Sequence, residues 1–324
     1  MAVYTQLGAE ALAEIVAAFD VGELVSAKGI AEGVSNSNWL IETSASGGTR
    51  FILTMYEQRT DVSELPFFLG LLDHLAERGC PVPRTIHDRQ GHSHRFHQGK
   101  ALALIEFLPG VSLSEPSAAQ AHAVGAALAR VHLAAADFEA TRGNSLSLPD
   151  WQALAEACGE QGLASIDPGL AGLVTSELAF LTQHWPQDLP RSVIHADLFP
   201  DNVLMLGDEV TGLIDFYFAC TDITAYDLAI THAAWCFADS GRRFDPAVSA
   251  ALLSGYQAIR PLSLKEREKL PILARGAAMR FLATRSYDWL HTAADAMVTR
   301  KDPMAFARRL EFYAKPENAA MFRE

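Results

Sequence analysis

The hydrophobic pattern of the chain changes near Leu108-Pro109-Gly110. Before this point, short β-branched and aromatic runs are separated by turn residues, which is typical of a strand meander. These runs are residues 24–30, 38–43, 50–56, 84–87, 94–96 and 101–107, with helical spacing at 7–19 and 65–78. After it, the spacing is mainly helical, with short strands only between 192 and 216. The sequence therefore predicts an α+β fold with a small β-rich N-terminal lobe (1–107), a larger helical C-terminal lobe (108–324) and a cleft between them.

The composition indicates a globular protein that does not use nucleic acid as its main partner. The chain has 324 residues, 49% of them hydrophobic, and a formal net charge of -13 that would repel a phosphate backbone. The longest stretches without a charged residue are 14 residues, 116–129 and 246–259, too short for a membrane span. The four cysteines form no Cys-x-x-Cys pair, and the first lysine is Lys28, so there is no basic start of a signal peptide. We expect a cytoplasmic protein with free thiols.

The segment from Val193 to Leu204 carries the residues with the clearest chemistry. A strand delivers His195, then Asp197 two residues later and Asn202 after that, while the next strand ends at Asp215. Phosphoryl transfer needs a carboxylate that orients the attacking hydroxyl and accepts its proton, together with oxygen ligands for magnesium. Asp197 suits the catalytic base, Asn202 and Asp215 suit the metal ligands, and His195 suits a packing support. A polar turn between two core strands is the alternative, but the added Asp215-Phe216 makes chance less plausible.

The spacing after Asp215 favours a small acceptor over a protein. Only 11 residues separate Asp215 from Asp227, and no Ala-Pro-Glu follows, whereas a protein kinase needs a long segment there to dock a peptide. Asp227 suits a buried acid that braces the catalytic loop.

Four further motifs extend this pattern. They are Gly33-Val34-Ser35-Asn36-Ser37-Asn38-Trp39, 51–57, 214–220 and Tyr226-Asp227-Leu228-Ala229. With the segment 195–202 they resemble the aminoglycoside phosphotransferase and choline kinase superfamily, and within it the homoserine kinases. The resemblance implies a protein-kinase-like bilobal fold with an N-terminal nucleotide-binding lobe and a C-terminal catalytic and acceptor-binding lobe. It also implies ATP and Mg²⁺ as cofactors, and the phosphorylation of homoserine as a step of threonine biosynthesis.

Two segments are candidates for nucleotide binding. Gly33, Ser35, Asn36 and Ser37 could cover the phosphates as a turn between strands, although an ordinary hairpin would look the same. The extended segment at 105–110 has the form of a hinge whose backbone, at Glu106 and Leu108, could bind adenine, and the resemblance favours this over a plain connection.

The lysine that many kinases place on the third strand is missing. Thr54 stands there, as in the homoserine kinases that the chain resembles. Lys28 and Arg59 are candidate replacements, and Glu64 is a candidate partner for such a residue, although solvated surface positions are favoured for all three.

The acceptor side is less well defined. Tyr217, Asp222 and Trp235 form acidic and aromatic surroundings that would suit a cation, so an amino alcohol such as choline or ethanolamine, methylthioribose or an aminoglycoside stays open as acceptor beside homoserine. Trp235 is by default a core aromatic of a helix, and its nearness in sequence to Asp227 is the reason for a role in lining the acceptor pocket. Homoserine also needs a partner for its carboxylate, which the sequence leaves unnamed, and the absent lysine leaves a silent nucleotide-binding protein as a further alternative. The oligomeric state is open.

The histidines of the predicted hairpin are expected to be solvated rather than to bind metal; they are His87, His92, His94 and His97.

Overall fold

The computed structural model describes residues 5, 7–30, 36–45, 49–57, 61–292 and 300–322. By its internal contacts the chain divides into two compact units, Met1–Pro109 and Gly110–Glu324. Gly33, Ser35 and Arg59 lie outside the described residues. Within the described part of the chain, no helix combines the length and the apolar character that crossing a membrane requires.

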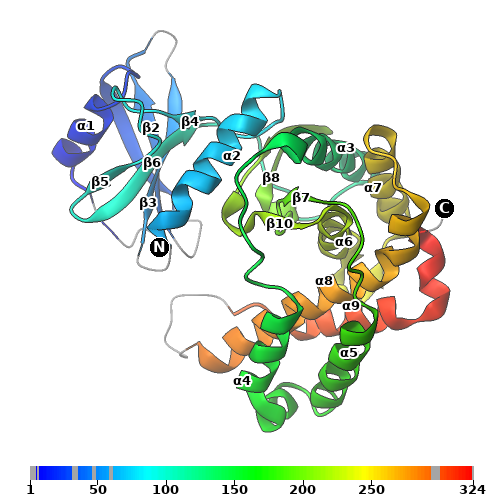
Figure 1. The fold of residues 1–324 in the computed structure, drawn as a ribbon. Coiled ribbons are helices and arrows are strands. Elements are labelled where there is room, and N and C mark those ends of the chain that lie inside the picture. The colour runs from blue at the N-terminus through cyan, green and yellow to red at the C-terminus, as the bar shows by residue number, and fades with distance from the viewer. Residues whose placement is uncertain are drawn as a thin grey trace. The chain divides into compact units, whose positions relative to one another are not determined.

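The first unit is built on an antiparallel sheet in the order β1-β2-β3-β6-β4, with β5 also paired to β6. The strands are β1 (Leu24–Ile30), β2 (Asn36–Thr43), β3 (Arg50–Tyr56), β4 (Thr85–Ile86), β5 (Arg95–His97) and β6 (Lys100–Glu106). Two helices, α1 (Ala9–Ala17) and α2 (Leu65–Glu77), flank the sheet (Figure 1). The predicted strand meander and both predicted helices are confirmed.

The core of this unit follows from the two periodicities of its sequence. Leu12, Ile15 and Val16 lie on one face of α1 because their spacing matches the turns of a helix. They pack on Trp39 and Ile41, which alternate along β2 and therefore point to the same side of the sheet.

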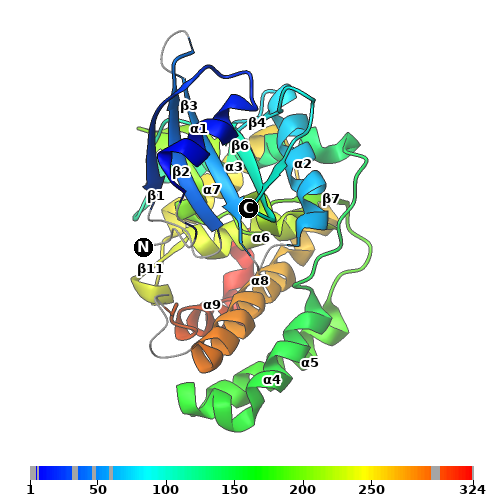
Figure 2. The same cartoon turned by 90° about the vertical axis from the view of Figure 1, so that its left-hand side faces the viewer.

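The second unit is mainly helical. Its helices are α3 (Ala118–Ala134), α4 (Leu148–Ile166), α5 (Leu170–His184), α6 (Thr224–Trp235), α7 (Pro246–Ile259), α8 (Leu264–His291) and α9 (Met304–Ala314). Its short strands form three antiparallel pairs, β7 (Arg191–Ile194) with β10 (Cys220–Ile223), β8 (Val203–Leu206) with β9 (Glu209–Leu213), and β11 (Phe237–Ala238) with β12 (Arg243–Phe244). Helices α4 and α5 run beside each other and against α8 (Figure 2).

Helices α3 and α7 approach each other at glycines. A Cβ atom on Gly125 would lie 2.2 Å from the Leu252 carbonyl oxygen, and one on Gly255 would lie 2.0 Å from the His122 carbonyl oxygen. Because no side chain fits at either point, glycine lets the two backbones touch. This contact fixes α3, whose His132 bonds Asp227, the carboxylate that holds the functional loop described below.

Candidate active site

The loop between β7 and β8 contains Asp197, the predicted catalytic base. Its geometry is set by Asn202, whose Nδ2 donates to the Asp197 carbonyl oxygen at 2.8 Å and to Asp197 Oδ2 at 3.3 Å. The sequence places Pro200 between the two, and the chain turns there in the short 3₁₀ segment η3 (Pro200–Asn202), so that residues five apart come into contact. The structure therefore brings the predicted base and one predicted metal ligand together.

Asp227, at the start of α6, braces this loop from inside the protein. Its carboxylate accepts hydrogen bonds from the backbone N–H of His195 at 2.7 Å, from that of Ala196 at 2.8 Å, and from His132 Nε2 at 3.0 Å. Burial acts to raise the pKa of Asp227, but the hydrogen bond and charge of His132 and the His195 N–H outweigh it and lower the pKa. Asp227 is thus held as a buried carboxylate that fixes the two residues preceding Asp197.

Asp215, the second predicted metal ligand, directly follows β9 and is tied to the same loop through backbone bonds. The Ile214 N–H donates to the Asn202 carbonyl oxygen at 3.0 Å, and His195 Nε2 bonds the Ile214 carbonyl oxygen at 2.9 Å. Because His195 Nδ1 accepts from the Asp197 N–H at 3.2 Å, the neutral ring carries its proton on Nε2. The imidazole therefore connects the Asp197 loop to the segment that presents Asp215.

The backbone is strained at both ends of this arrangement. Ala196 has a φ of 63° and Asp215 a φ of 65°, in the left-handed region that L-residues rarely occupy. Such a conformation costs about 1–2 kcal/mol per residue and persists where the surroundings enforce it, most often at functional sites. Here the bonds to Asp227 and Asn202 enforce it.

The electrostatics of the site favour a bound cation. Burial raises the pKa of Asp197 to about 7, with Arg280 lowering it and Asp215 raising it. Asp215 is exposed at the surface, yet the surrounding protein partly desolvates its carboxylate and raises its pKa, and Asp201 adds to the effect. A cation between these groups would relieve the repulsion of the carboxylates.

The donor set suits magnesium better than a transition metal. Asn202 and Asp215 supply oxygen atoms, and Mg²⁺ commonly uses one or two carboxylates together with phosphate oxygens and water. Over residues 5, 7–30, 36–45, 49–57, 61–292 and 300–322 there is no group of three or more His, Cys, Asp or Glu side chains that could hold a metal without such help.

Two side chains from the helices hold the back of the loop. Arg280 of α8, which is buried, donates through Nη1 to the Ala196 carbonyl oxygen, and Trp235 at the end of α6 donates through Nε1 to the Leu198 carbonyl oxygen at 2.9 Å. Trp235 was predicted to line the acceptor pocket. Its buried indole instead contacts the loop that carries Asp197, and a direct contact with the acceptor stays a prediction.

The other predicted acceptor residues follow Asp215 along the chain. Tyr217 is half-buried in η4 (Phe216–Phe218), and Asp222 is buried in β10. The Asp222 carboxylate accepts from Asn144 Nδ2 at 2.7 Å and pairs with Arg191 Nη2 at 3.2 Å. Their role toward an acceptor stays a prediction.

The first unit places the described nucleotide candidates at two ends of its sheet. Asn36 and Ser37 begin β2 and are buried, and the Ser37 hydroxyl donates to Glu57 Oε1 at 2.7 Å. Glu106 ends β6, where its carboxylate accepts from the Arg84 N–H at 3.2 Å, and Leu108 follows two residues later, half-buried. Their contacts with a nucleotide stay predictions.

An ion pair in this unit was missed by sequence reasoning. Lys100 Nζ, at the start of β6, pairs with Glu57 Oε2, just beyond β3. Thr54, at the expected lysine position, is buried and donates to Asn38 Oδ1 at 2.8 Å. Antiparallel pairing of Met55 with Leu102 puts positions 57 and 100 opposite each other, so only the register of β3 and β6 could have revealed the pair.

Comparison with known proteins identifies the family of this chain. Residues 26–262 match the phosphotransferase enzyme family. A homoserine kinase of Azorhizobium caulinodans is 50% identical over 313 residues, covering 97% of this chain and 96% of the relative. One of Gluconobacter oxydans is 49% identical over 315 residues, covering 97% and 98%, and one of Brucella canis is 47% identical over 325 residues, covering 99% and 97%.

Solved structures of small-molecule kinases have the same fold. An amicoumacin kinase in complex with AMP-PNP, Ca²⁺ and Ami superposes with a TM-score of 0.70 at 15% identity, covering 95% of this chain and 93% of that one. A spectinomycin phosphotransferase in complex with ADP and spectinomycin gives 0.70 at 13% identity, covering 98% of each. The predicted α+β, protein-kinase-like fold is thereby confirmed. With half of its residues shared over nearly the full length of such relatives, the chain belongs to the phosphotransferase enzyme family and, within it, to the homoserine kinases.

Proposed function

We propose that this chain transfers the γ-phosphoryl group of ATP to the side-chain hydroxyl of L-homoserine, giving O-phospho-L-homoserine and ADP. The choice of acceptor rests on the similarity of this chain to relatives named homoserine kinase, which are 47–50% identical to it over nearly its whole length. The loop geometry supports the phosphoryl transfer itself, since Asn202 contacts Asp197 and the segment that presents Asp215 is bonded to the same loop, and these residue types suit a base and two oxygen ligands.

Asp197 acts on the acceptor in this proposal. Its carboxylate accepts a hydrogen bond from the homoserine hydroxyl, orients the oxygen toward the γ-phosphorus, and takes the proton as the new P–O bond forms and the bond to the ADP oxygen breaks. The Asn202 amide holds the Asp197 side chain in one orientation, and Asp227 fixes the backbone before it. This preorganisation removes the need to order the base during the reaction.

Asn202 and Asp215 would hold Mg²⁺ on the triphosphate. The bound ion would neutralise charge on the phosphate oxygens. His195 supports this role because it ties the Ile214 carbonyl to the loop that carries Asn202, so the two ligands move as one element. Binding of ATP by the first unit is part of the same proposal.

The test is ADP release measured over a panel of acceptors. Purified protein with Mg-ATP is assayed with homoserine, choline, ethanolamine, methylthioribose and an aminoglycoside, and kcat/KM is compared. We expect homoserine to exceed every other acceptor by about 100-fold or more, since buried polar groups discriminate strongly against a ligand that leaves them unpaired. Preference for another acceptor would replace homoserine in the proposal, and release of ADP no faster than without acceptor would refute it.

A further inference from the structure

Helix α8 runs past the loop that carries Asp197. Arg280 of this helix bonds the Ala196 carbonyl oxygen, and the next residue, Phe281, packs its ring edge-on against Phe199 with centroids 4.9 Å apart. Phe281 and Phe199 also contact Phe306 of α9, at centroid distances of 4.9 and 6.1 Å. The C-terminal part of α8 is thus fixed beside residues 196–201.

Arg285 follows on this part of α8 and lacks a carboxylate partner among the described residues. Its guanidinium lies over the Phe306 ring, 4.5 Å from the centroid, and Nη1 donates to the Asp302 carbonyl oxygen at 3.4 Å. The Asp302 carboxylate itself accepts from the Met304 N–H at 2.9 Å and pairs with Arg308 Nη1 at 3.6 Å.

Arg275, on the same helix, has a guanidinium that is fully paired with a carboxylate. Arg275 is bound by both carboxylate oxygens of Glu177, at 2.7–2.9 Å, in the forked geometry that arginine forms with carboxylates. Arg285 is half-buried, so its charge is also partly removed from water, yet its fork has only one backbone carbonyl. The remaining N–H donors of this guanidinium are free of a protein carboxylate in the described part of the chain and can bind an anion that arrives from solution.

The contacts of Arg285 place it beside the loop that carries Asp197. The Phe306 ring under its guanidinium also contacts Phe199 of that loop, with the ring centroids 6.1 Å apart. Burial lowers the pKa of Arg285, and the carboxylates that oppose this effect are Asp197 first, then Asp302 and Asp201. Arg285 therefore lies beside the loop that presents Asp197, in the part of the molecule that an acceptor bound to Asp197 would occupy.

From this geometry we infer that Arg285 binds the α-carboxylate of the amino-acid acceptor while Asp197 receives its hydroxyl. The inference rests on the proposed function, since it assigns one end of the homoserine molecule. Homoserine carries its hydroxyl and its carboxylate at opposite ends of a short aliphatic chain, so the two residues would select an acceptor that has both groups. Lys301 is a poorer candidate, because it is exposed and already lies 3.8 Å from the Asp201 carboxylate.

The experiment compares homoserine with homoserine amide, in which a neutral carboxamide replaces the carboxylate, as acceptors for the wild type and for Arg285→Met. For the wild type we expect kcat/KM to be about 10- to 100-fold higher with homoserine, the effect of a charge-assisted hydrogen bond. For Arg285→Met we expect this ratio of kcat/KM values to fall to about 1, while kcat/KM for homoserine amide stays equal to that of the wild type. The matched control is Arg300→Met, because Arg300 stacks on Trp289 at 5.0 Å and bonds its carbonyl, and this variant should keep the wild-type ratio.

The ratio separates this assignment from other roles of Arg285. A purely structural role would lower kcat/KM equally for both acceptors. A role at the triphosphate would raise the KM for ATP and leave the ratio of the two acceptors unchanged. Either result would overturn the inference. If the wild type does not phosphorylate homoserine at all, the proposed function fails. If it does and the ratio survives in Arg285→Met, only the inference fails.

Discussion

Asp227→Asn removes one charge and one acceptor atom from the brace of the catalytic loop without changing its shape. In the native protein the two carboxylate oxygens are shared among three donors, with Oδ1 accepting from Ala196 N–H and Oδ2 from both His195 N–H and His132 Nε2. An asparagine amide has only one oxygen, so its NH₂ group must face at least one of the two backbone N–H groups. All of these groups are buried.

The expected loss of stability follows from these contacts. A buried N–H left without an acceptor costs about 1–3 kcal/mol, and each remaining hydrogen bond loses about 1 kcal/mol when its charged acceptor becomes neutral. Together these give a destabilisation of about 3–5 kcal/mol. Because the backbone that faces Asp227 immediately precedes Asp197, we also expect kcat to fall about 100-fold or more, with a smaller change in the KM for ATP.

Asp245→Asn is the matched control. Asp245 also accepts two backbone N–H groups, those of Ala247 and Val248 at the start of α7, but both bonds end on its Oδ1, which asparagine retains. Asparagine is as good a helix cap as aspartate, so a change within about 0.5 kcal/mol is expected.

The assay is urea denaturation followed by circular dichroism, with steady-state kinetics on the same preparations. A loss below about 1 kcal/mol for Asp227→Asn, or one equal to that of Asp245→Asn, would show that the carboxylate does not hold the loop as described.

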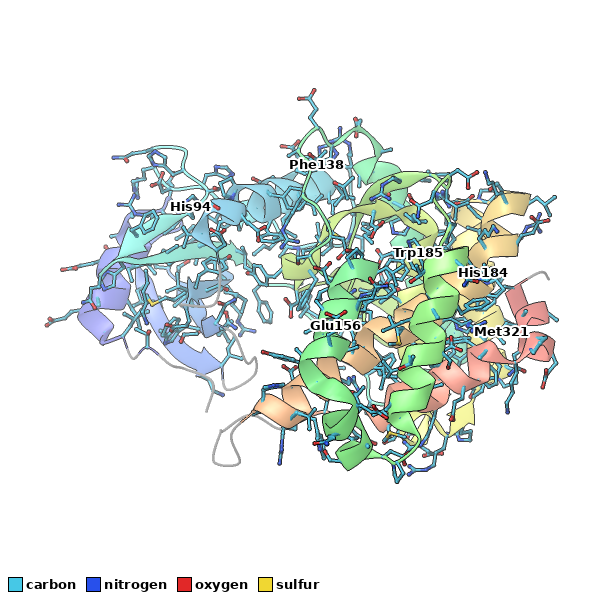
Figure 3. The ribbon with its side chains drawn as sticks, turned by 60° about the horizontal axis from the view of Figure 1, so that its bottom comes forward. His94, Phe138, Glu156, His184, Trp185 and Met321 are labelled. Carbon is cyan, nitrogen blue, oxygen red and sulfur yellow. The ribbon has the colours of Figure 1, made fainter. Side chains whose placement is uncertain are left out.

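Three shorter predictions concern other parts of the molecule. Burial lowers the pKa of His232 to about 3, so between pH 6.5 and 3 the unfolded chain binds a proton that the folded chain does not. The free energy of unfolding should therefore decrease as the pH is lowered, by about 2 kcal/mol at pH 5. In denaturation curves measured across this pH range, His232→Gln should lose this part of the pH dependence. In Gly276→Ala the new methyl group would lie 2.1 Å from the ring of Trp185, which follows directly on α5 (Figure 3) and packs against Trp151 and Tyr226. The free energy of unfolding should therefore fall by about 1–3 kcal/mol, measured in thermal melts. Removing Mg²⁺ with EDTA should stop turnover, and Asp215→Asn should raise the Mg²⁺ concentration for half-maximal rate about tenfold or more in a titration; an unchanged requirement would remove Asp215 from the metal site.

The parts of the site that could be predicted from the sequence are local in the chain. His195, Asp197 and Asn202 lie within one loop, and Asp215 ends the next strand pair, so their spacing alone indicates that they meet. The lobes were predictable for a similar reason, since a period of two residues gives way to helical spacing at one point of the chain.

The parts that could not be predicted depend on contacts between distant segments. The Lys100–Glu57 pair follows from the register of two strands, which no pattern within either strand specifies. Arg285 looks like any other arginine of a long helix until the packing of Phe281 on Phe199 shows which loop it faces. Trp235 was assigned by its nearness to Asp227, while its hydrogen bond to the Leu198 carbonyl depends on how α6 docks on the loop.

The most direct test of the catalytic assignment is the product formed by the wild type and by Asp197→Asn, followed by phosphorus NMR and mass spectrometry. With homoserine and Mg-ATP, the wild type should form a phosphate monoester on the side-chain hydroxyl. Asp197→Asn should bind ATP with similar affinity but form this product about 100- to 10,000-fold more slowly, because it has lost the group that accepts the proton. The same product formed at the wild-type rate by Asp197→Asn, or no phosphate ester from the wild type, would contradict the account.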